Sequence, residues 1–69
     1  MKQLYTMLVW TNSMDRMEKL LGQFRIGLNE WDKTRAFDYQ GGQVVSYTIL
    51  CDESVFVSIT NIMNGITVY

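Results

Sequence analysis

The first run of hydrophobic positions lies in residues 3–10. Apolar and aromatic side chains occupy both sets of alternate positions there: Leu4, Tyr5, Met7, Leu8, Val9 and Trp10. A strand with two apolar faces suits the centre of a sheet. We therefore expect residues 3–10 to form a central strand.

From Met14 onward the hydrophobic positions recur at spacings of three and four. The series consists of Met14, Met17, Leu21, Phe24, Leu28 and Trp31. Asn12 and Ser13 are good helix caps, and Asp15 suits a first helical turn. This pattern predicts an amphipathic helix over residues 14–31.

A second interpretation ends that helix at Gly22. Phe24, Ile26 and Leu28 then alternate along one face of a strand. Six positions in helical register outweigh three in strand register, so the longer helix is favoured.

After Trp31 the hydrophobic period becomes two, which is typical of strands. The sequence predicts strands over residues 34–39, 44–51, 55–60 and 66–69. Short turn signals separate them: Gly41-Gly42, Asp52-Glu53-Ser54 and Asn64-Gly65. The predicted order is therefore β-α-β-β-β-β.

This order predicts a single α+β domain over residues 1–69, with one helix packed on one face of a mostly antiparallel meander sheet. The covered face takes Phe37, Tyr39, Val45, Tyr47, Ile49, Val55, Val57 and Ile59 from the strands. The uncovered face takes Thr34, Ala36, Asp38, Val44, Ser46, Thr48, Leu50, Phe56, Ser58 and Thr60. Because one helix cannot cover both faces, the second face is expected to need another molecule.

The reactive side chains present in the sequence limit the kinds of catalytic or metal site that the chain can form. The 69 residues include no histidine and a single cysteine, Cys51. Histidine-dependent triads and intrachain disulfides are therefore excluded, and we expect neither a metal site nor a cofactor. Cys51 precedes Asp52 and Glu53, which disfavour a thiolate, so we interpret it as a packing residue.

The acidic residues that come closest to a catalytic cluster are Glu30, Asp32 and Asp38. We interpret them as ordinary charged surface residues instead of a catalytic group.

The charge balance argues against nucleic acid and membranes as partners. The net charge is −1, and all six basic residues lie before residue 36. Proteins that neutralise many phosphates normally carry a basic excess. No apolar run approaches membrane-spanning length, and a lone cysteine suits a reducing compartment, so a cytoplasmic location is expected.

These observations favour a non-enzymatic protein-binding module that occludes a partner's surface. Small viral or phage-type accessory inhibitors of host proteins share this overall character. The expected partner-binding residues are Arg16, Lys19, Trp31, Arg35 and Phe56. A homo-oligomeric protein that binds or sequesters a nucleotide-like small molecule is the alternative. Small size and an uncovered sheet face also predict a homodimer.

Overall fold

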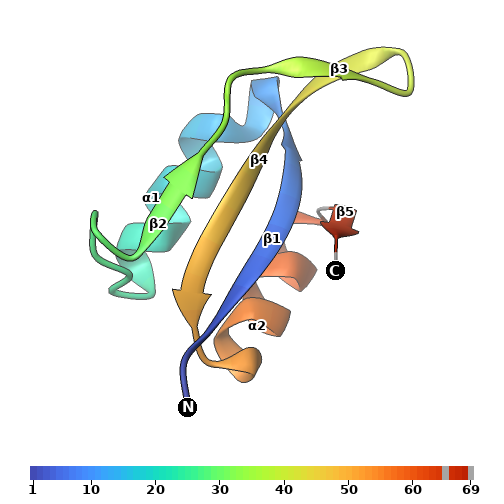
Figure 1. The fold of residues 1–69 in the computed structure, drawn as a ribbon. Helices are drawn as coiled ribbons and strands as arrows, with labels where there is room; N and C mark the ends of the chain where they lie inside the picture. The colour runs from blue at the N-terminus through green and yellow to red at the C-terminus, as the bar shows by residue number, and fades with distance from the viewer. Residues whose placement is uncertain (65, 69) are drawn as a thin grey trace.

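The computed structural model describes residues 1–64 and 66–68, and Figure 1 shows their arrangement. The elements are β1 (Gln3–Trp10), a 3-10 turn η1 (Thr11–Ser13), α1 (Met14–Gln23), β2 (Trp31–Lys33), β3 (Phe37–Tyr39), β4 (Gly42–Cys51), α2 (Glu53–Met63) and β5 (Ile66–Val68). The α+β class and the antiparallel sheet are confirmed. The predicted order is wrong over residues 55–60, where a second helix stands in place of a strand. The predicted meander is wrong as well, because the strand order is β2-β4-β1-β5.

The sheet is built around the antiparallel pair β1 and β4. Gln3 pairs with Cys51 and Trp10 with Val44, so the two strands match along their whole shared length. The order across the sheet is β2-β4-β1-β5, with β3 also paired to β4. Each helix therefore connects two strands that lie on either side of a third. This connectivity is the split β-α-β pattern of ferredoxin-like folds.

Strands β2 and β3 are two pieces of one edge strand. Asp32 pairs with Thr48 in β4, and Phe37 pairs with Val44. Between the pieces, the backbone N–H of Thr34 donates to the carbonyl of Ser46 at 3.0 Å. Two residues, 35 and 36, then stand opposite the single residue 45, which is a β-bulge. The bulge shifts the alternation by one, so Phe37 and Tyr39 lie on the opposite face from the one predicted.

Both helices lie on the same face of the sheet, behind the strands in Figure 1. α1 contributes Met17, Leu20 and Leu21 to the core, and α2 contributes Phe56, Ile59 and Met63. The sheet contributes Met7, Val9, Val45, Tyr47, Ile49 and Cys51. The prediction that Val45, Tyr47 and Ile49 face a helix is confirmed. The opposite face of the sheet, called here the open face, carries no helix within the described chain.

Helix α1 begins at Met14 as predicted but ends at Gln23, well before Trp31. The amide of Ile26 donates to the carbonyl of Leu21, and that of Arg25 donates to Gly22, both at 3.0 Å. Arg25 has a positive φ of 59°. These are the bonds of a Schellman motif, which terminates a helix. The favoured long helix is therefore wrong beyond Gln23, and Leu28 lies exposed in a loop instead of the core. Phe24, Ile26 and Leu28 form no strand either.

Residues 53–63 form helix α2, so the strand predicted over 55–60 is wrong. Phe56, Ile59 and Met63 recur at spacings of three and four and are buried together. Hydroxyl groups within the helix donate to backbone carbonyls one turn earlier, such as Ser58 to Ser54 at 3.0 Å. Packing against the sheet thus outweighs the strand preference of the β-branched residues.

The two predicted turns that flank this segment are the start and the end of a helix, not the turns of hairpins. Asp52 is the N-cap residue, and its carbonyl accepts the amides of Val55 and Phe56, each at 3.1 Å. Asn64 ends the helix in the left-handed conformation, with φ 52°. Residue 65, and residue 69 of the predicted last strand, lie outside the described residues; the strand itself is present as β5.

Candidate functional site

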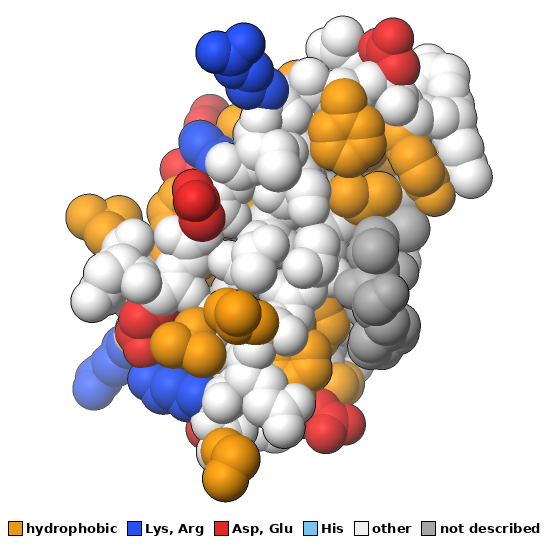
Figure 2. Space-filling model, in the orientation of Figure 1, with side chains coloured by type: hydrophobic (Ala, Val, Ile, Leu, Met, Phe, Trp, Pro, Cys, Tyr) orange, Lys and Arg blue, Asp and Glu red, His pale blue; other side chains and the backbone are white. Residues whose placement is uncertain are grey.

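The open face has a hydroxyl-rich middle and two apolar ends. Its central positions on β1 and β4 carry Thr6, Ser46 and Thr48, together with Leu8, which pairs with Ser46 and is 7% exposed. The hydroxyl oxygens of Thr6 and Thr48 lie 3.3 Å apart. Figure 2 views this face, with hydrophobic side chains gathered toward the upper right and the lower part and basic side chains at the margin. Among the described face positions of β1, β2, β3 and β4, Asp32 is the charged residue. This face is the candidate interaction surface.

One end of the open face holds an aromatic cluster of Trp10, Phe37 and Tyr39. The rings of Trp10 and Tyr39 lie 6.2 Å apart and are tilted by 59°. Val44, which lies between Trp10 and Phe37 in the sheet register, is fully buried. Trp10 and Phe37 themselves remain 36% and 40% exposed. The cluster is therefore packed underneath and open to solvent above.

Gly42 leaves the space that the Trp10 ring occupies. A Cβ atom at residue 42 would lie 2.7 Å from Trp10 Cζ3, which is too close for any real contact. The ring thus covers the glycine across the strand pair, a known use of aromatic residues in sheets. The β3–β4 hairpin continues past the end of β1 in Figure 1, so the cluster lies at the base of a projecting arm.

The other end of the open face holds the leucine patch of Leu4, Leu28 and Leu50. Leu4 pairs with Leu50 across β1 and β4, and Leu28 approaches from the loop before β2. With Trp31, Asp32 and Thr48 they line an open groove of about 420 Å³. Leu4 is 70% exposed and Leu28 is 87% exposed. Leucines this exposed and close together form an unusual surface for a small domain.

The five predicted partner-binding residues do not come together. Arg16 and Lys19 lie exposed on α1, where the Arg16 guanidinium donates to the carbonyl of Ile62 at 3.2 Å and so joins α1 to the last turn of α2. Arg35 is exposed at the bulge of the sheet edge. Trp31 is half-buried on the helix-covered face, with its ring 5.7 Å from that of Tyr47.

Phe56 was expected on the uncovered face of the sheet, and this is wrong. It lies on α2, is 3% exposed, and stacks on the ring of Tyr5 at 4.7 Å between centroids. A buried core residue does not contact a partner directly. Phe56 therefore leaves the candidate site.

Glu18 joins α1 to two strands on the covered side. Its Oε2 accepts from Lys33 Nζ at 2.7 Å and from the Tyr47 hydroxyl at 2.8 Å. The hydrogen bond from Lys33, and then that from Tyr47, hold the pKa of Glu18 below its ordinary value. Burial, reinforced by the hydrogen bond to Glu18, raises the pKa of Tyr47. This group orients the helix and contributes nothing to the open face.

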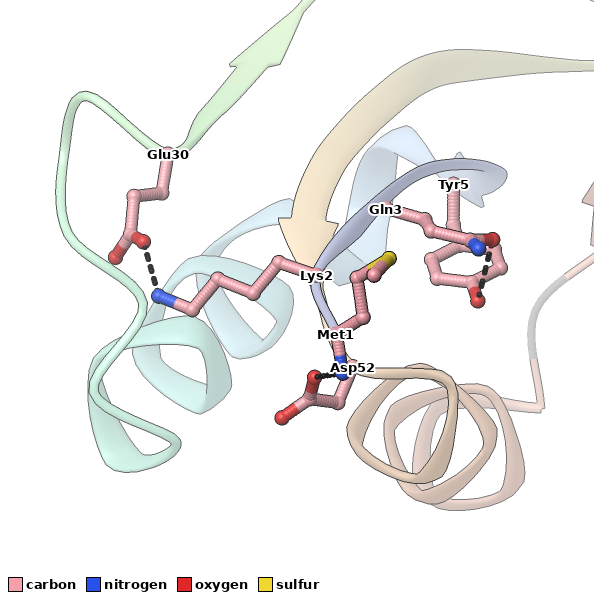
Figure 3. A network of polar contacts seen from close by, with 6 residues as sticks. All are labelled: Met1, Lys2, Gln3, Tyr5, Glu30 and Asp52. Carbon is pink, nitrogen blue, oxygen red and sulfur yellow. Dashed lines mark hydrogen bonds and ion pairs between the residues drawn. The ribbon is translucent and has the colours of Figure 1, made fainter.

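The remaining candidates for chemistry have structural partners. Cys51 is buried in the core, and burial, followed by the charge of Asp52, raises the pKa of its thiol. Glu30 is paired with Lys2 at 2.6 Å between Oε2 and Nζ (Figure 3). Asp38 accepts from the Gln43 side chain at 3.3 Å. No three His, Cys, Asp or Glu residues of the described chain are placed to hold a metal ion.

Sequence reasoning missed the residues that make the open face distinctive. Leu28 was assigned to a helix stripe and Phe37 to the covered face, because the left-handed position of the Schellman motif is Arg25 instead of glycine and the bulge has no glycine or proline to mark it. Trp10 was placed correctly in a strand, and the nearby Gly42 is the signal that could have identified its exposed setting. Within the described residues, no helix has the length and apolar character needed to cross a membrane. Comparison with protein-family models, with curated proteins and with solved structures finds no match for this chain.

Proposed function

We propose that this chain is a non-enzymatic protein-binding module that covers part of a partner protein with the open face of its sheet. The aromatic cluster is the anchor of the contact. One observation carries the proposal: the Trp10 ring lies directly against Gly42, packed on the sheet, while more than a third of it stays exposed. Large aromatic side chains that are ordered before binding dominate the energy of many protein interfaces.

The surroundings of the cluster favour a protein over a nucleic acid. Stacking of bases on exposed rings normally goes with basic side chains that follow the phosphates. The described positions of the open face carry Asp32 and no lysine or arginine, and Asp38 lies on the hairpin beside the cluster. A hydroxyl-rich surface between apolar ends suits the mixed polar and apolar character of a protein interface.

The test compares proteins retained by the wild-type chain with those retained by matched variants. Trp10→Ala removes the anchor. Gly42→Val keeps the tryptophan in the chain but forces its ring out of the position it occupies over residue 42. Val57→Ala is the control, because Val57 is 46% exposed on α2, away from the open face. We expect a protein retained by the wild type and the control to be lost from both cluster variants, with affinity at least ten-fold weaker, or about 1.4 kcal/mol.

If the chain acts by occlusion, binding should also inhibit the captured protein. Its own activity or its binding to a third molecule should fall in proportion to the added wild-type chain, and should not fall with Trp10→Ala. A partner that binds Trp10→Ala as tightly as wild type contradicts the proposal. So does a nucleotide-sized ligand that shifts the melting temperature of the wild type but not of Trp10→Ala, because that result favours small-molecule binding at the cluster.

A further inference from the structure

The loop before β2 holds Leu28 on a braced turn. The amide of Glu30 donates to the carbonyl of Gly27 at 2.9 Å, which closes a four-residue turn with Leu28 at its second position. The Glu30 carboxylate accepts the amide of Gly27 through Oε1 at 3.0 Å and Lys2 Nζ through Oε2 at 2.6 Å. Figure 3 shows Lys2 reaching across to Glu30. One carboxylate thus ties the turn both to its own first residue and to the residue just before β1.

Residues 27–29, called here the lid, form a short arch between two fixed points. On one side of the arch, Ile26 is buried in the core. On the other side, the carbonyl of Glu30 accepts the amide of Leu50 at 2.7 Å, which fixes the backbone there to β4. Leu28 is the middle residue of the arch, so a rotation of the lid between its two anchors moves the Leu28 side chain and leaves the core unchanged.

The lid borders the groove at the leucine end of the open face. Leu4 and Leu50 pair across β1 and β4, and Leu28 lines the same groove from the lid. Leu28 and Leu4 are both mostly exposed. Apolar side chains in water gain free energy by moving together, so a leucine that stays outside an adjacent leucine-lined groove must be held there. The bonds of the turn to Glu30, and of Glu30 to Lys2, are the restraint that the structure shows.

The restraint depends on an ion pair at the surface. The hydrogen bond from Lys2, and then that from the amide of Gly27, hold the pKa of Glu30 below its ordinary value, so the carboxylate is ionised at neutral pH. The side chains of Lys2 and Glu30 both remain partly exposed, so the pair lies outside the core. Without Lys2, the Glu30 carboxylate is free to turn away from Gly27, and the backbone bond of the turn is then left to hold the lid.

We infer that the Lys2–Glu30 ion pair keeps the leucine groove open, and that the lid closes over the groove when this pair is broken. In the closed state Leu28 packs on Leu50 and Leu4, and the apolar surface at this end of the open face is withdrawn from other molecules. Lys2 is a positioning residue, since it acts on Leu28 through Glu30. The device goes beyond the proposed function, because it controls the leucine patch and does not involve the aromatic cluster.

Solvent paramagnetic relaxation of methyl groups, combined with through-space NMR contacts between them, tests the lid. In the wild type, a soluble paramagnetic agent should relax the Leu28 methyl groups strongly, and these groups should show no contact with those of Leu4. In Lys2→Ala and in Glu30→Ala, the Leu28 methyl groups should lose most of that relaxation and gain contacts with Leu4 and Leu50.

Two further variants serve as controls. Lys2→Arg keeps the ion pair with Glu30, so Leu28 should stay exposed as in the wild type. Lys19→Ala removes a lysine from the exposed surface of α1, away from the groove, and should also leave Leu28 exposed. The methyl signals of Ile49, which is fully buried, show whether each variant is folded.

A double variant tests the force that closes the lid. If leucine packing drives closure, Lys2→Ala combined with Leu4→Ser should return the relaxation of Leu28 toward the wild-type value. The inference is overturned if Leu28 is as exposed in folded Lys2→Ala and Glu30→Ala as in the wild type. It is overturned equally if Leu28 is already protected in the wild type, or if Lys19→Ala protects Leu28 as well as Lys2→Ala does.

Discussion

The two faces of the β1–β4 sheet differ in how far their side chains are buried. On the covered face, side chains such as Tyr47 and Ile49 are fully buried under two helices. On the open face, one strand position away, Thr48 keeps only partial cover, and Leu4 and Leu28 are mostly exposed. The covered face therefore holds the fold together, whereas the open face is available for contacts with other molecules. Substitutions on the covered face should accordingly lower the stability of the fold, whereas substitutions on the open face should weaken association and leave the fold largely intact.

The largest effect is expected for Phe56→Asp, in helix α2, which packs on the covered face. The substitution removes the stack on Tyr5 and places an unpaired carboxylate in the core. Loss of a buried phenylalanine alone costs about 3–5 kcal/mol, and a buried charge adds to it, so the domain should be largely unfolded. Circular dichroism with urea titration measures this. A folded Phe56→Asp protein of near wild-type stability would show that α2 does not cover the sheet.

An intermediate effect is expected for Glu18→Gln, which removes the charge that joins α1 to Lys33 and Tyr47. Loss of charge-assisted hydrogen bonds at a partly exposed site should cost about 1–2 kcal/mol at neutral pH. Urea unfolding at several pH values gives the free energies to compare.

The pH dependence of that difference has a defined sign. The pKa of Glu18 is lower in the folded chain than its ordinary value, so its contribution is present above the unfolded pKa and is lost as pH falls through the folded pKa. The stability of wild type should therefore approach that of Glu18→Gln in acid. A difference that stays constant from neutral to strongly acidic pH would contradict this role for Glu18.

The smallest effect on folding is expected for Leu4→Ser and Leu28→Ser, on the open face. Both side chains are already mostly in water, so the free energy of unfolding of the monomer should change by no more than about 0.5 kcal/mol. Urea unfolding at low protein concentration checks this, with Ile49→Ser as the buried counterpart expected to lose several-fold more. A loss of stability in Leu28→Ser as large as in Ile49→Ser would remove the distinction between the faces.

The features that follow local rules could be predicted from the sequence. Strand β1, strand β4 and the start of α1 follow from local periodicity and from caps, and each lies where it was expected. The errors arose where local preference competes with packing. Residues 55–60 have strand-forming composition, yet Phe56, Ile59 and Met63 bury together only when the segment is helical.

The candidate site was less predictable because it depends on a few backbone details. Arg25 adopts the left-handed conformation that ends α1, although glycine is the usual residue there. The bulge at residues 35 and 36 reverses the facing of Phe37 and Tyr39. Each detail moves an apolar side chain from the expected core to the open face. Neither leaves a periodic signal in the sequence, so the interaction surface had to be read from the structure.

Solvent paramagnetic relaxation of side-chain methyl groups, measured by NMR on a dilute sample, tests the central claim most directly. One face of the sheet is covered by helices, and the other is available to partners. A soluble paramagnetic agent should therefore relax the methyl groups of Leu4 and Leu28 strongly and those of Leu21 and Ile59 weakly. Strong relaxation of Leu21 and Ile59, with Leu4 and Leu28 protected at every dilution, would contradict it.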